Sequence, residues 1–178
     1  MDPVRVATAA DAETVAAIYG HYVTHTAISF EEEPPSTDEM ARRIAYTLET
    51  HPFLVYDDGQ GVLGYAYGST HVPRAAYRWS CNVSVYVAPG LARRGIGRVL
   101  YRTLLDILRA QGFHSAFGGV ALPNDASVGL HEAMGFQHLG TYREVGFKQG
   151  RWHDVGWWRL GLAEGQPERE PIPFAALT

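Results

Sequence analysis

The stretch from Val83 to Leu108 restricts the possible folds more than any other part of the chain. Residues 83–87 are rich in valine and tyrosine and predict a strand, which Pro89-Gly90 ends. Apolar residues then recur along one side of a helix, at Ile96, Val99, Leu100, Leu104, Ile107 and Leu108. A strand that leads through a glycine-rich turn into a long amphipathic helix predicts an α/β domain.

The turn between this strand and helix has the composition of an anion-binding site. A helix N-terminus presents unpaired N–H groups and a partial positive charge. Gly95 and Gly97 would let a phosphate approach the backbone, and Arg93, Arg94 and Arg98 add charge. The alternative is a purely structural turn, but the three arginines favour phosphate binding. No Lys-Ser/Thr pair follows the glycines and a third glycine is missing, which excludes the P-loop and the dinucleotide fingerprint.

The remaining patterns predict alternating strands and helices. Strands are expected near residues 4–7, 53–56, 62–67, 79–87, 115–121, 137–147 and 154–162. Helices are expected near residues 8–24, 36–48, 96–111 and 127–134. The order predicts a mixed α/β sheet with helices on both sides. Residues 1–165 are expected to form one domain, and residues 166–178, with three prolines, a terminal strap or tail.

Composition narrows the class of protein. The charge of −4 and the scattered basic residues disfavour nucleic acid or a membrane surface as partner. The single cysteine, Cys81, cannot form an internal disulfide and is expected inside a strand. His21 and His25 have metal-ligand spacing, but no third ligand is near in sequence, so no metal is expected. Without an N-terminal signal segment or a long apolar run, we expect a cytoplasmic protein.

Three motifs carry a resemblance to a known family. Val85-Tyr86-Val87-Ala88-Pro89 with Arg93-Arg94-Gly95-Ile96-Gly97-Arg98 resembles motif A of the GNAT N-acetyltransferases, which binds the acetyl-CoA pyrophosphate. Residues 122–136 resemble the second cofactor segment of the family. Residues 145–156 resemble a signature of its phosphinothricin/methionine sulfoximine branch, and the similarity extends from about Arg5 to Leu162. One departure is Ala92, where the family usually has Gln or Arg.

The resemblance implies the GNAT fold and a set of cofactor contacts. The fold is a mixed, mostly antiparallel central sheet of about six to seven strands, splayed at the cofactor site and flanked by about four helices. The backbone of Val85, Tyr86 and Val87 would hold the pantetheine arm and the thioester carbonyl. The pyrophosphate would bind at Arg93, Arg94, Gly95, Ile96, Gly97 and Arg98. The resemblance also implies a homodimer.

Two residues of the second cofactor segment and one histidine are further candidates by resemblance. Asn124 and Ser127 would contact the pantetheine or its phosphate, although Asn124 could instead be a plain turn or helix N-cap residue. His131 stands where relatives carry His or Tyr near the cofactor sulfur, so it would protonate the departing thiolate. The alternative for His131 is a histidine packed beside the sheet.

The position of the general base is where the chain departs most from its apparent relatives. Members of the branch carry a glutamate on the long strand as the candidate base, and an ungapped alignment places Asn82 there. Asparagine cannot accept the proton of an ammonium group. A water relay, Glu31, His153 or a partly deprotonated substrate would have to replace it. Loss of catalysis is the remaining alternative.

Substrate contacts are implied for two loops. The first supplies Phe30 and Glu31, and the second supplies Arg74 and Tyr77. Arg74 could form a bidentate pair with an amino-acid carboxylate, or could be a solvated surface charge. Phosphinothricin-specific enzymes carry Arg at the position of Glu31, so a carboxylate there is expected to repel a phosphinate. The tryptophans 152, 157 and 158 are expected in sheet packing or a dimer contact rather than against ligand.

The sequence thus supports one leading function and two alternatives. The leading function is an acetyl-CoA-dependent N-acetyltransferase acting by direct attack on the amine of a small amino acid or analogue, such as phosphinothricin, methionine sulfoximine or methionine sulfone. The alternatives are a peptide or protein N-terminal acetyltransferase and a non-catalytic acetyl-CoA-binding protein. Arg74 and the Phe30 loop favour a closed pocket over an open peptide groove.

Overall fold

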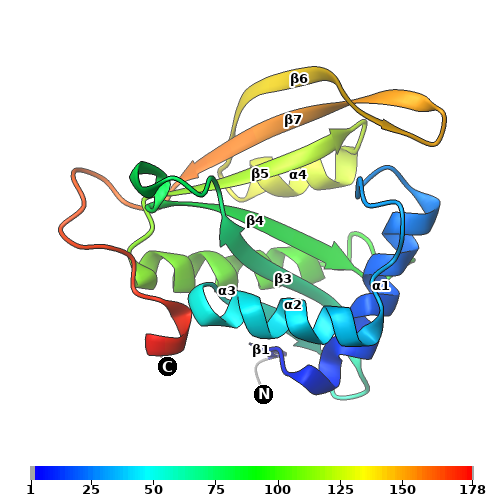
Figure 1. The fold of residues 1–178 in the computed structure, drawn as a ribbon, viewed down its shortest axis with the longest axis horizontal. Helices are drawn as coiled ribbons and strands as arrows, with labels where there is room; N and C mark the ends of the chain where they lie inside the picture. Colours follow the sequence, from blue (N-terminus) through cyan, green and yellow to red (C-terminus); the bar gives the residue numbers. More distant parts are fainter. Residues whose placement is uncertain (1–2, 178) are drawn as a thin grey trace.

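A computed structural model describes residues 3–177 and shows one seven-stranded sheet in the order β1-β2-β3-β4-β5-β7-β6 (Figure 1). The strands are β1 (Val4–Val6), β2 (Phe53–Asp57), β3 (Val62–Thr70), β4 (Ser80–Val87), β5 (Ser115–Leu122), β6 (Gln137–Lys148) and β7 (Arg151–Gly161). Neighbouring strands pair antiparallel except β4 and β5, which pair in parallel. The predicted mixed, mostly antiparallel sheet is confirmed.

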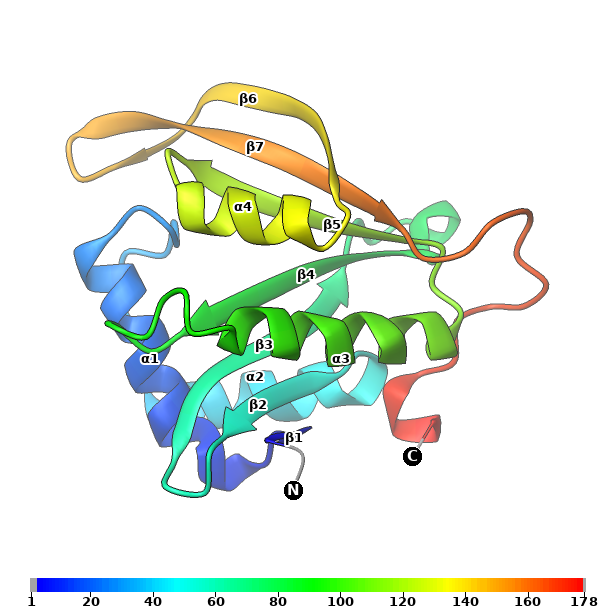
Figure 2. The same cartoon turned by 180° about the vertical axis from the view of Figure 1, so that it is seen from behind.

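Four helices cover the sheet from both sides (Figures 1 and 2). They are α1 (Ala12–His25), α2 (Thr37–Thr50), α3 (Ile96–Gln111) and α4 (Asp125–Ala133). Helices α1 and α2 lie on one face, and α3 and α4 on the other. None of the helices in the described part of the chain has the length and hydropathy that a membrane crossing needs.

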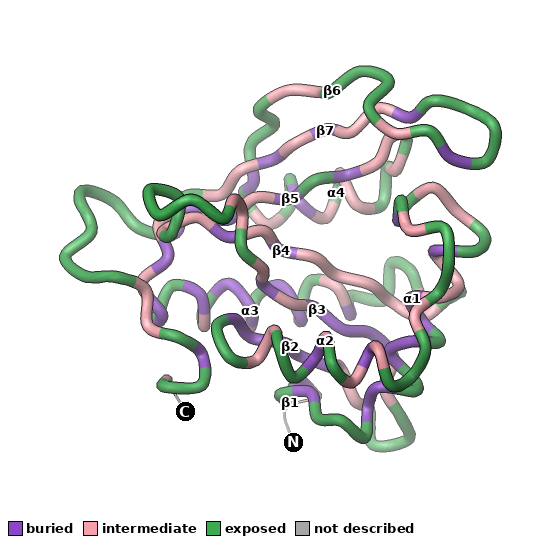
Figure 3. The backbone as a smooth tube through the Cα atoms, in the orientation of Figure 1, coloured by how far each residue is buried: buried purple, intermediate pink, exposed green. Residues whose placement is uncertain are grey.

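Two apolar cores result from this layering, one on each side of the sheet (Figure 3). The larger core joins the fully buried face of α3, including Leu100 and Leu104, to one face of the strands. Cys81 belongs to this core, as expected for a strand residue. The second core joins α1 and α2 to the opposite face, where Tyr65 and Val55 are buried. Alternation along each strand divides its side chains between the two cores.

Helix boundaries follow the capping signals of the sequence. The Ser36 hydroxyl accepts a hydrogen bond from the Glu39 amide (3.1 Å) and begins α2. The Asp11 carboxylate accepts from the Thr8 amide (2.8 Å) before α1. Gly112, with φ of 95°, ends α3 in the left-handed conformation that glycine adopts without strain.

The segment after residue 165 returns to the domain and is fastened there. The Ile172 amide donates to the carbonyl of Gln111 (2.8 Å), and the Gln111 side chain donates to the Ile172 carbonyl (2.7 Å). The same amide nitrogen donates to the Thr50 carbonyl (2.9 Å) at the end of α2. Phe174, in the short turn η3 (Phe174–Ala176), is 5% exposed. These contacts hold the segment against the ends of α2 and α3.

Candidate active site

The central feature of the site is a gap between β4 and β5. The two strands pair only at Ser80–Ser115, Cys81–Ala116 and Asn82–Phe117, and beyond Asn82 they diverge (Figure 2). A narrow cavity of about 50 Å³ occupies the divergence, with α3 and α4 on its far side. An extended ligand can therefore enter between two strands without displacing a hydrogen-bonded ladder.

The backbone of β4 offers alternate residues to this gap. The Ala88 amide donates to Leu63 (2.8 Å), so the main-chain groups of Tyr86 point toward β3 and those of Val87 and Val85 point into the gap. The Val87 carbonyl already accepts from the Tyr22 hydroxyl (2.6 Å). Among the three residues expected to hold a pantetheine arm, Val85 is thus the best placed. Tyr86 contributes its side chain, which packs on Tyr65 at 5.3 Å between ring centroids.

The arginine turn begins α3 and lies against the end of β4. Gly90, Arg93 and Gly95 all have positive φ angles (81°, 65° and 84°), which turns the backbone sharply before the helix. A Cβ at Gly97 would lie 3.1 Å from Leu130 of α4 and 3.8 Å from Val85, so glycine allows α3 to approach the gap closely.

The side chains of this turn carry unneutralised positive charge. Arg93, Arg94 and Arg98 are exposed, and none forms an ion pair within residues 3–177. Three free guanidinium groups beside a helix N-terminus can bind a pyrophosphate.

On the other side of the gap lie three residues from the start and the last turn of α4, and all three border the cavity: Asn124, Ser127 and His131. Asn124 is also the helix N-cap, since its side-chain oxygen accepts from the Ser127 amide (3.1 Å). A capping role and a ligand contact are compatible, because the carboxamide keeps its NH₂ group free for a second partner.

His131 is buried and held at both ring nitrogens. Its Nδ1 donates to the Ser127 carbonyl (2.8 Å), and its Nε2 accepts from the Tyr101 hydroxyl (3.1 Å). Burial lowers the pKa of His131, so the ring is neutral at pH 7. In this arrangement the hydrogen between the two side chains belongs to the Tyr101 hydroxyl, and Tyr101 borders the gap. A proton supplied by His131 would therefore have to pass through Tyr101, which sequence analysis missed because it lies 30 residues away on α3.

A larger cavity of about 610 Å³ adjoins the gap on the face that α1 covers. Its walls are apolar and aromatic, from Phe30, Tyr142, Val145, Val155 and Trp157. Its floor includes Ser69, Asn82, Ser84 and Gly119. The cavity shares six lining residues with the gap: Ile28, Val83, Ser84, Tyr86, Gly119 and Ala121. The cavity can therefore deliver a small amine to whatever group occupies the gap.

Trp157 is placed differently from the sequence expectation. It lines the large cavity, and its ring lies 3.1 Å from the position that a Cβ on Gly119 would occupy. Trp158 is buried in the core and Trp152 is 58% exposed. Alternation along β7 puts Trp157 and Trp158 on opposite faces, and the register with β5 brings Trp157 to the site.

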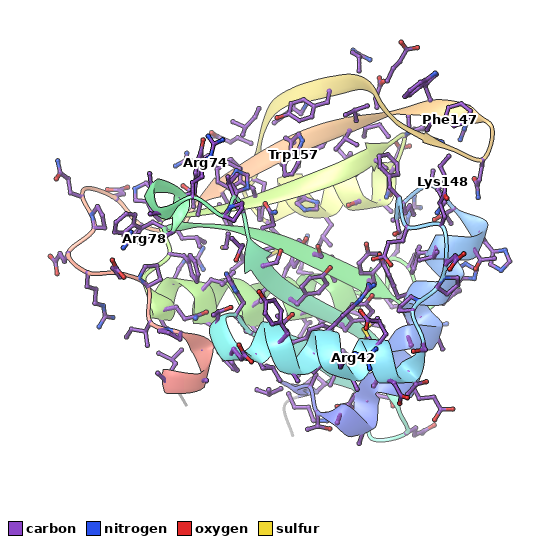
Figure 4. The ribbon with its side chains drawn as sticks, viewed as in Figure 1. Arg42, Arg74, Arg78, Phe147, Lys148 and Trp157 are labelled. Carbon is purple, nitrogen blue, oxygen red and sulfur yellow. The ribbon has the colours of Figure 1, made fainter. Side chains whose placement is uncertain are left out.

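The loop that carries Phe30 and Glu31 is fastened to the β6–β7 hairpin by Lys148, the single lysine of the chain (Figure 4). Its ammonium group donates to the carbonyls of Val23 (2.6 Å), Ser29 (2.7 Å) and Glu31 (2.8 Å). The ring of Phe30 lies on Gly146, where an added Cβ would be only 2.1 Å from the ring. These contacts position one wall of the cavity.

Glu31 does not present a free carboxylate. It accepts hydrogen bonds from the guanidinium of Arg43 (2.8 Å) and the hydroxyl of Tyr19 (2.8 Å). Burial opposes its ionisation, but these hydrogen bonds outweigh that effect and hold the pKa of Glu31 below its usual value. A carboxylate so stabilised is a weak base.

His153 is the other residue expected to replace the missing general base. It is buried, and its Nε2 lies 3.0 Å from the Lys148 carbonyl.

Arg74 and Tyr77 lie apart from the other predicted substrate residues. Both border a separate cavity of about 320 Å³, next to the strap after residue 165. Arg74 precedes and Tyr77 ends the short turn η2 (Ala75–Tyr77), which connects β3 to β4, and Figure 4 shows Arg74 in this connection. The ring of Tyr77 reaches to 6.0 Å from that of His71, which in turn contacts Asn82. The loop that carries Arg74 and Tyr77 thus approaches the large cavity through His71.

The splayed strands, the arginine turn and the adjoining cavity together define a transferase of the GNAT type. The chain belongs to the acetyltransferase (GNAT) domain family, whose model matches residues 4–157.

Similar proteins agree with this assignment. Phosphinothricin N-acetyltransferase of Streptomyces coelicolor is 42% identical over 163 residues, which cover 89% of this chain and 95% of that protein. The L-methionine sulfoximine/L-methionine sulfone acetyltransferase of Salmonella typhimurium is 35% identical over 162 residues, covering 90% and 95%. A phosphinothricin acetyltransferase from Sinorhizobium meliloti, solved with acetyl-CoA, superposes with a TM-score of 0.90 at 34% identity, covering 98% and 97%. The family resemblance of the sequence motifs is confirmed.

Proposed function

We propose that this chain transfers the acetyl group of acetyl-CoA to the amine of a small amino acid or amino-acid analogue by direct attack. The observation that carries the proposal is the continuity of the two cavities, which share six lining residues at the point where β4 leaves β5. One cavity runs beside the free backbone of Val85 and the arginine turn, and the other is large enough for a small amine.

The residues fit acetyl-CoA as co-substrate. Arg93, Arg94 and Arg98 supply the charge that a pyrophosphate needs, and the N–H and C=O of Val85 suit an amide-containing arm in the position of a missing strand. Asn124 and Ser127 border the same gap. When bound, acetyl-CoA supplies an activated acyl carbon at the border of the two cavities.

The large cavity favours a small amine with an apolar body. Phe30, Tyr142, Val155 and Trp157 surround it, and its one carboxylate is paired with Arg43. Relatives are named for phosphinothricin and for methionine sulfoximine or sulfone, and both kinds of substrate are amino-acid analogues. Arg74 remains our candidate for the substrate carboxylate, because its guanidinium has no partner among residues 3–177. It borders the separate cavity, and its loop is linked to the large cavity through the contacts of Tyr77 with His71 and of His71 with Asn82.

We also propose the homodimer that the resemblance implies. Five large apolar side chains are exposed on the β6–β7 hairpin, and a soluble monomer rarely leaves such a group uncovered. They are Leu139, Tyr142, Val145, Phe147 and Trp152. Sedimentation equilibrium of the full chain tests this: a monomer mass at micromolar concentration contradicts it.

The proposed reaction is tested by thiol release from acetyl-CoA in the presence of candidate amines. The panel should contain free amino acids, methionine sulfoximine, methionine sulfone, phosphinothricin and short peptides with free N-termini. We expect release with one or more amino-acid analogues and little with peptides. Preference for peptides would support the N-terminal acetyltransferase alternative. Binding of acetyl-CoA without release on any amine would support the non-catalytic alternative.

A further inference from the structure

In the structure, Asn82 has a histidine partner that the sequence analysis did not identify. Asn82 stands at the position expected for the base and cannot accept a proton, yet its side-chain oxygen lies 2.7 Å from Nδ1 of His71. We propose that His71 is the general base of the reaction and that Asn82 is the residue that orients it. This inference rests on the proposed acetyl transfer.

The hydrogen bonds assign the free nitrogen of the His71 ring. The amide nitrogen of Asn82 lies 3.5 Å from the Thr70 carbonyl, which directs the amide oxygen of Asn82 toward His71. That oxygen is an acceptor only, so His71 must donate to it through Nδ1–H. A neutral imidazole with its proton on Nδ1 carries its lone pair on Nε2. Asn82 thereby selects the tautomer that can accept a proton at the outer nitrogen.

Aromatic contacts hold the ring at the apex of the gap. The imidazole stacks on Phe117 at 4.3 Å between centroids and 16° between planes. Phe117 pairs with Asn82 in the last parallel register before the strands diverge. Trp157, a wall of the large cavity, meets the ring edge-on at 6.1 Å. His71 thus contacts two residues that border the large cavity, Asn82 and Trp157.

Few charged or titratable groups surround this ring. Phe117 of β5, Trp157 of β7 and Asn82 of β4 carry none. Tyr77 of η2 lies at 6.0 Å, and Arg159 of β7, which pairs with Phe117, is held by the Ser115 hydroxyl at 2.9 Å. No carboxylate contacts His71 within residues 3–177.

The step balances with the amine and acetyl-CoA alone. The ammonium group gives one proton to Nε2 of His71, and the freed lone pair attacks the thioester carbon to form the C–N bond. The C–S bond breaks with its electron pair on sulfur, and the second proton lost by nitrogen can serve the thiolate, with the Tyr101 hydroxyl among those that border the gap. His71 returns its proton to solvent, so one proton is released for each amide formed.

The test compares His71→Gln with wild type and with His25→Gln, a change at an exposed histidine of α1. A general base contributes roughly 10²- to 10⁴-fold, so kcat/KM for the best amine should fall at least about 100-fold in His71→Gln. The acetyl-CoA Kd should stay within about twofold, and His25→Gln should match wild type. Added imidazole should restore part of the rate to His71→Gln.

The pH profile separates a base from a structural role. The kcat/KM of wild type should rise with pH to a plateau, whereas that of His71→Gln should keep rising toward the amine's own pKa. Asn82→Asp keeps an acceptor for Nδ1–H and adds negative charge, so its plateau should begin at higher pH. A wild-type plateau that survives in His71→Gln, or an Asn82→Asp profile identical to wild type, overturns the inference. Wild type that binds acetyl-CoA but acetylates no amine overturns the proposed function instead.

Discussion

The charge that Glu31 presents to the cavity is offset by its partners. Arg43 and Tyr19 both bind its carboxylate, and Arg43 also bonds Glu39 on the same helix. An isolated carboxylate would repel a phosphinate, but one paired with a guanidinium has little net field at a distance. The expectation that Glu31 disfavours acidic substrates therefore loses its main physical support, and phosphinothricin belongs in the substrate panel.

Arg74 gives a direct test of how the substrate is oriented. If its guanidinium binds the substrate carboxylate, Arg74→Ala should raise KM for an amino acid about ten- to a hundred-fold, because a charge-assisted hydrogen bond contributes roughly 1.5–3 kcal/mol. The KM of the matching decarboxylated amine should change little. Steady-state kinetics on the two substrates measures the difference. Arg78→Ala, in the same cavity but paired with Glu170, is the control. Equal changes for both substrates would place Arg74 outside the substrate site.

The β6–β7 hairpin acts on the substrate loop through Lys148. Three carbonyls converge on one compact ammonium group, whose three N–H bonds match them one to one. We predict that Lys148→Met frees the loop and raises KM for the amine by about tenfold or more, with the acetyl-CoA Kd unchanged. Calorimetric titration with acetyl-CoA and amine kinetics measure the two effects. Arg151→Met, at an exposed site on the same hairpin, should behave as wild type. A parallel loss of acetyl-CoA binding would indicate general unfolding instead.

The end of α2 contains a histidine whose burial makes folding depend on pH. His51 is 6% exposed and stacks on Phe113, and burial lowers its pKa from 6.5 to about 4. The folded state therefore binds this proton less readily than the unfolded state. Stability from this group is complete above pH 6.5 and is lost as pH falls toward about 4, by at most about 1.4 kcal/mol per pH unit.

Urea unfolding of wild type and His51→Phe between pH 4 and 7 measures the contribution of His51 to the pH dependence of the free energy of unfolding. The phenyl ring keeps the stacking on Phe113 but cannot titrate, so the variant should lose less stability on acidification. His131 is also buried with a lowered pKa and leaves a similar residual slope in both proteins. Identical pH slopes for the two proteins would show that His51 does not titrate as proposed.

Cofactor binding should stabilise the whole domain, because the gap divides the sheet into two halves joined by three residue pairs. Acetyl-CoA binds only the folded chain, so it should raise Tm in proportion to its affinity. Replacing Arg93, Arg94 and Arg98 by alanine should reduce that rise and its salt dependence without lowering the Tm of the free protein. Gly97 is a poorer site for this test, since a larger residue also meets Leu130 of α4. Thermal scans with and without acetyl-CoA measure the rise in Tm. If the triple variant shows the same rise as wild type, the three arginines do not bind the pyrophosphate.

The local features of this protein could be predicted from its sequence. Periodicity and capping residues encode each helix and strand through interactions within a few residues, and the predicted elements lie close to those observed. The turn from Gly90 to Gly97 is equally local, since its shape depends on glycine conformations and its charge on adjacent arginines. The family motifs are continuous segments of the same kind. They were sufficient to identify the family and the sheet.

Contacts between distant segments were decided only by the tertiary structure. Asn82 was recognised as a missing base, but its bond to His71 depends on how β3 ends beside β4 and β5. Two further contacts depend on the path of a loop whose sequence has no periodic pattern. They are the ion pair of Glu31 with Arg43 and the hydrogen bonds of Lys148 to the substrate loop. Strand register and loop path result from the packing of the whole core. For that reason no short segment specifies them, and the electrostatics of the site emerges only when the chain is folded.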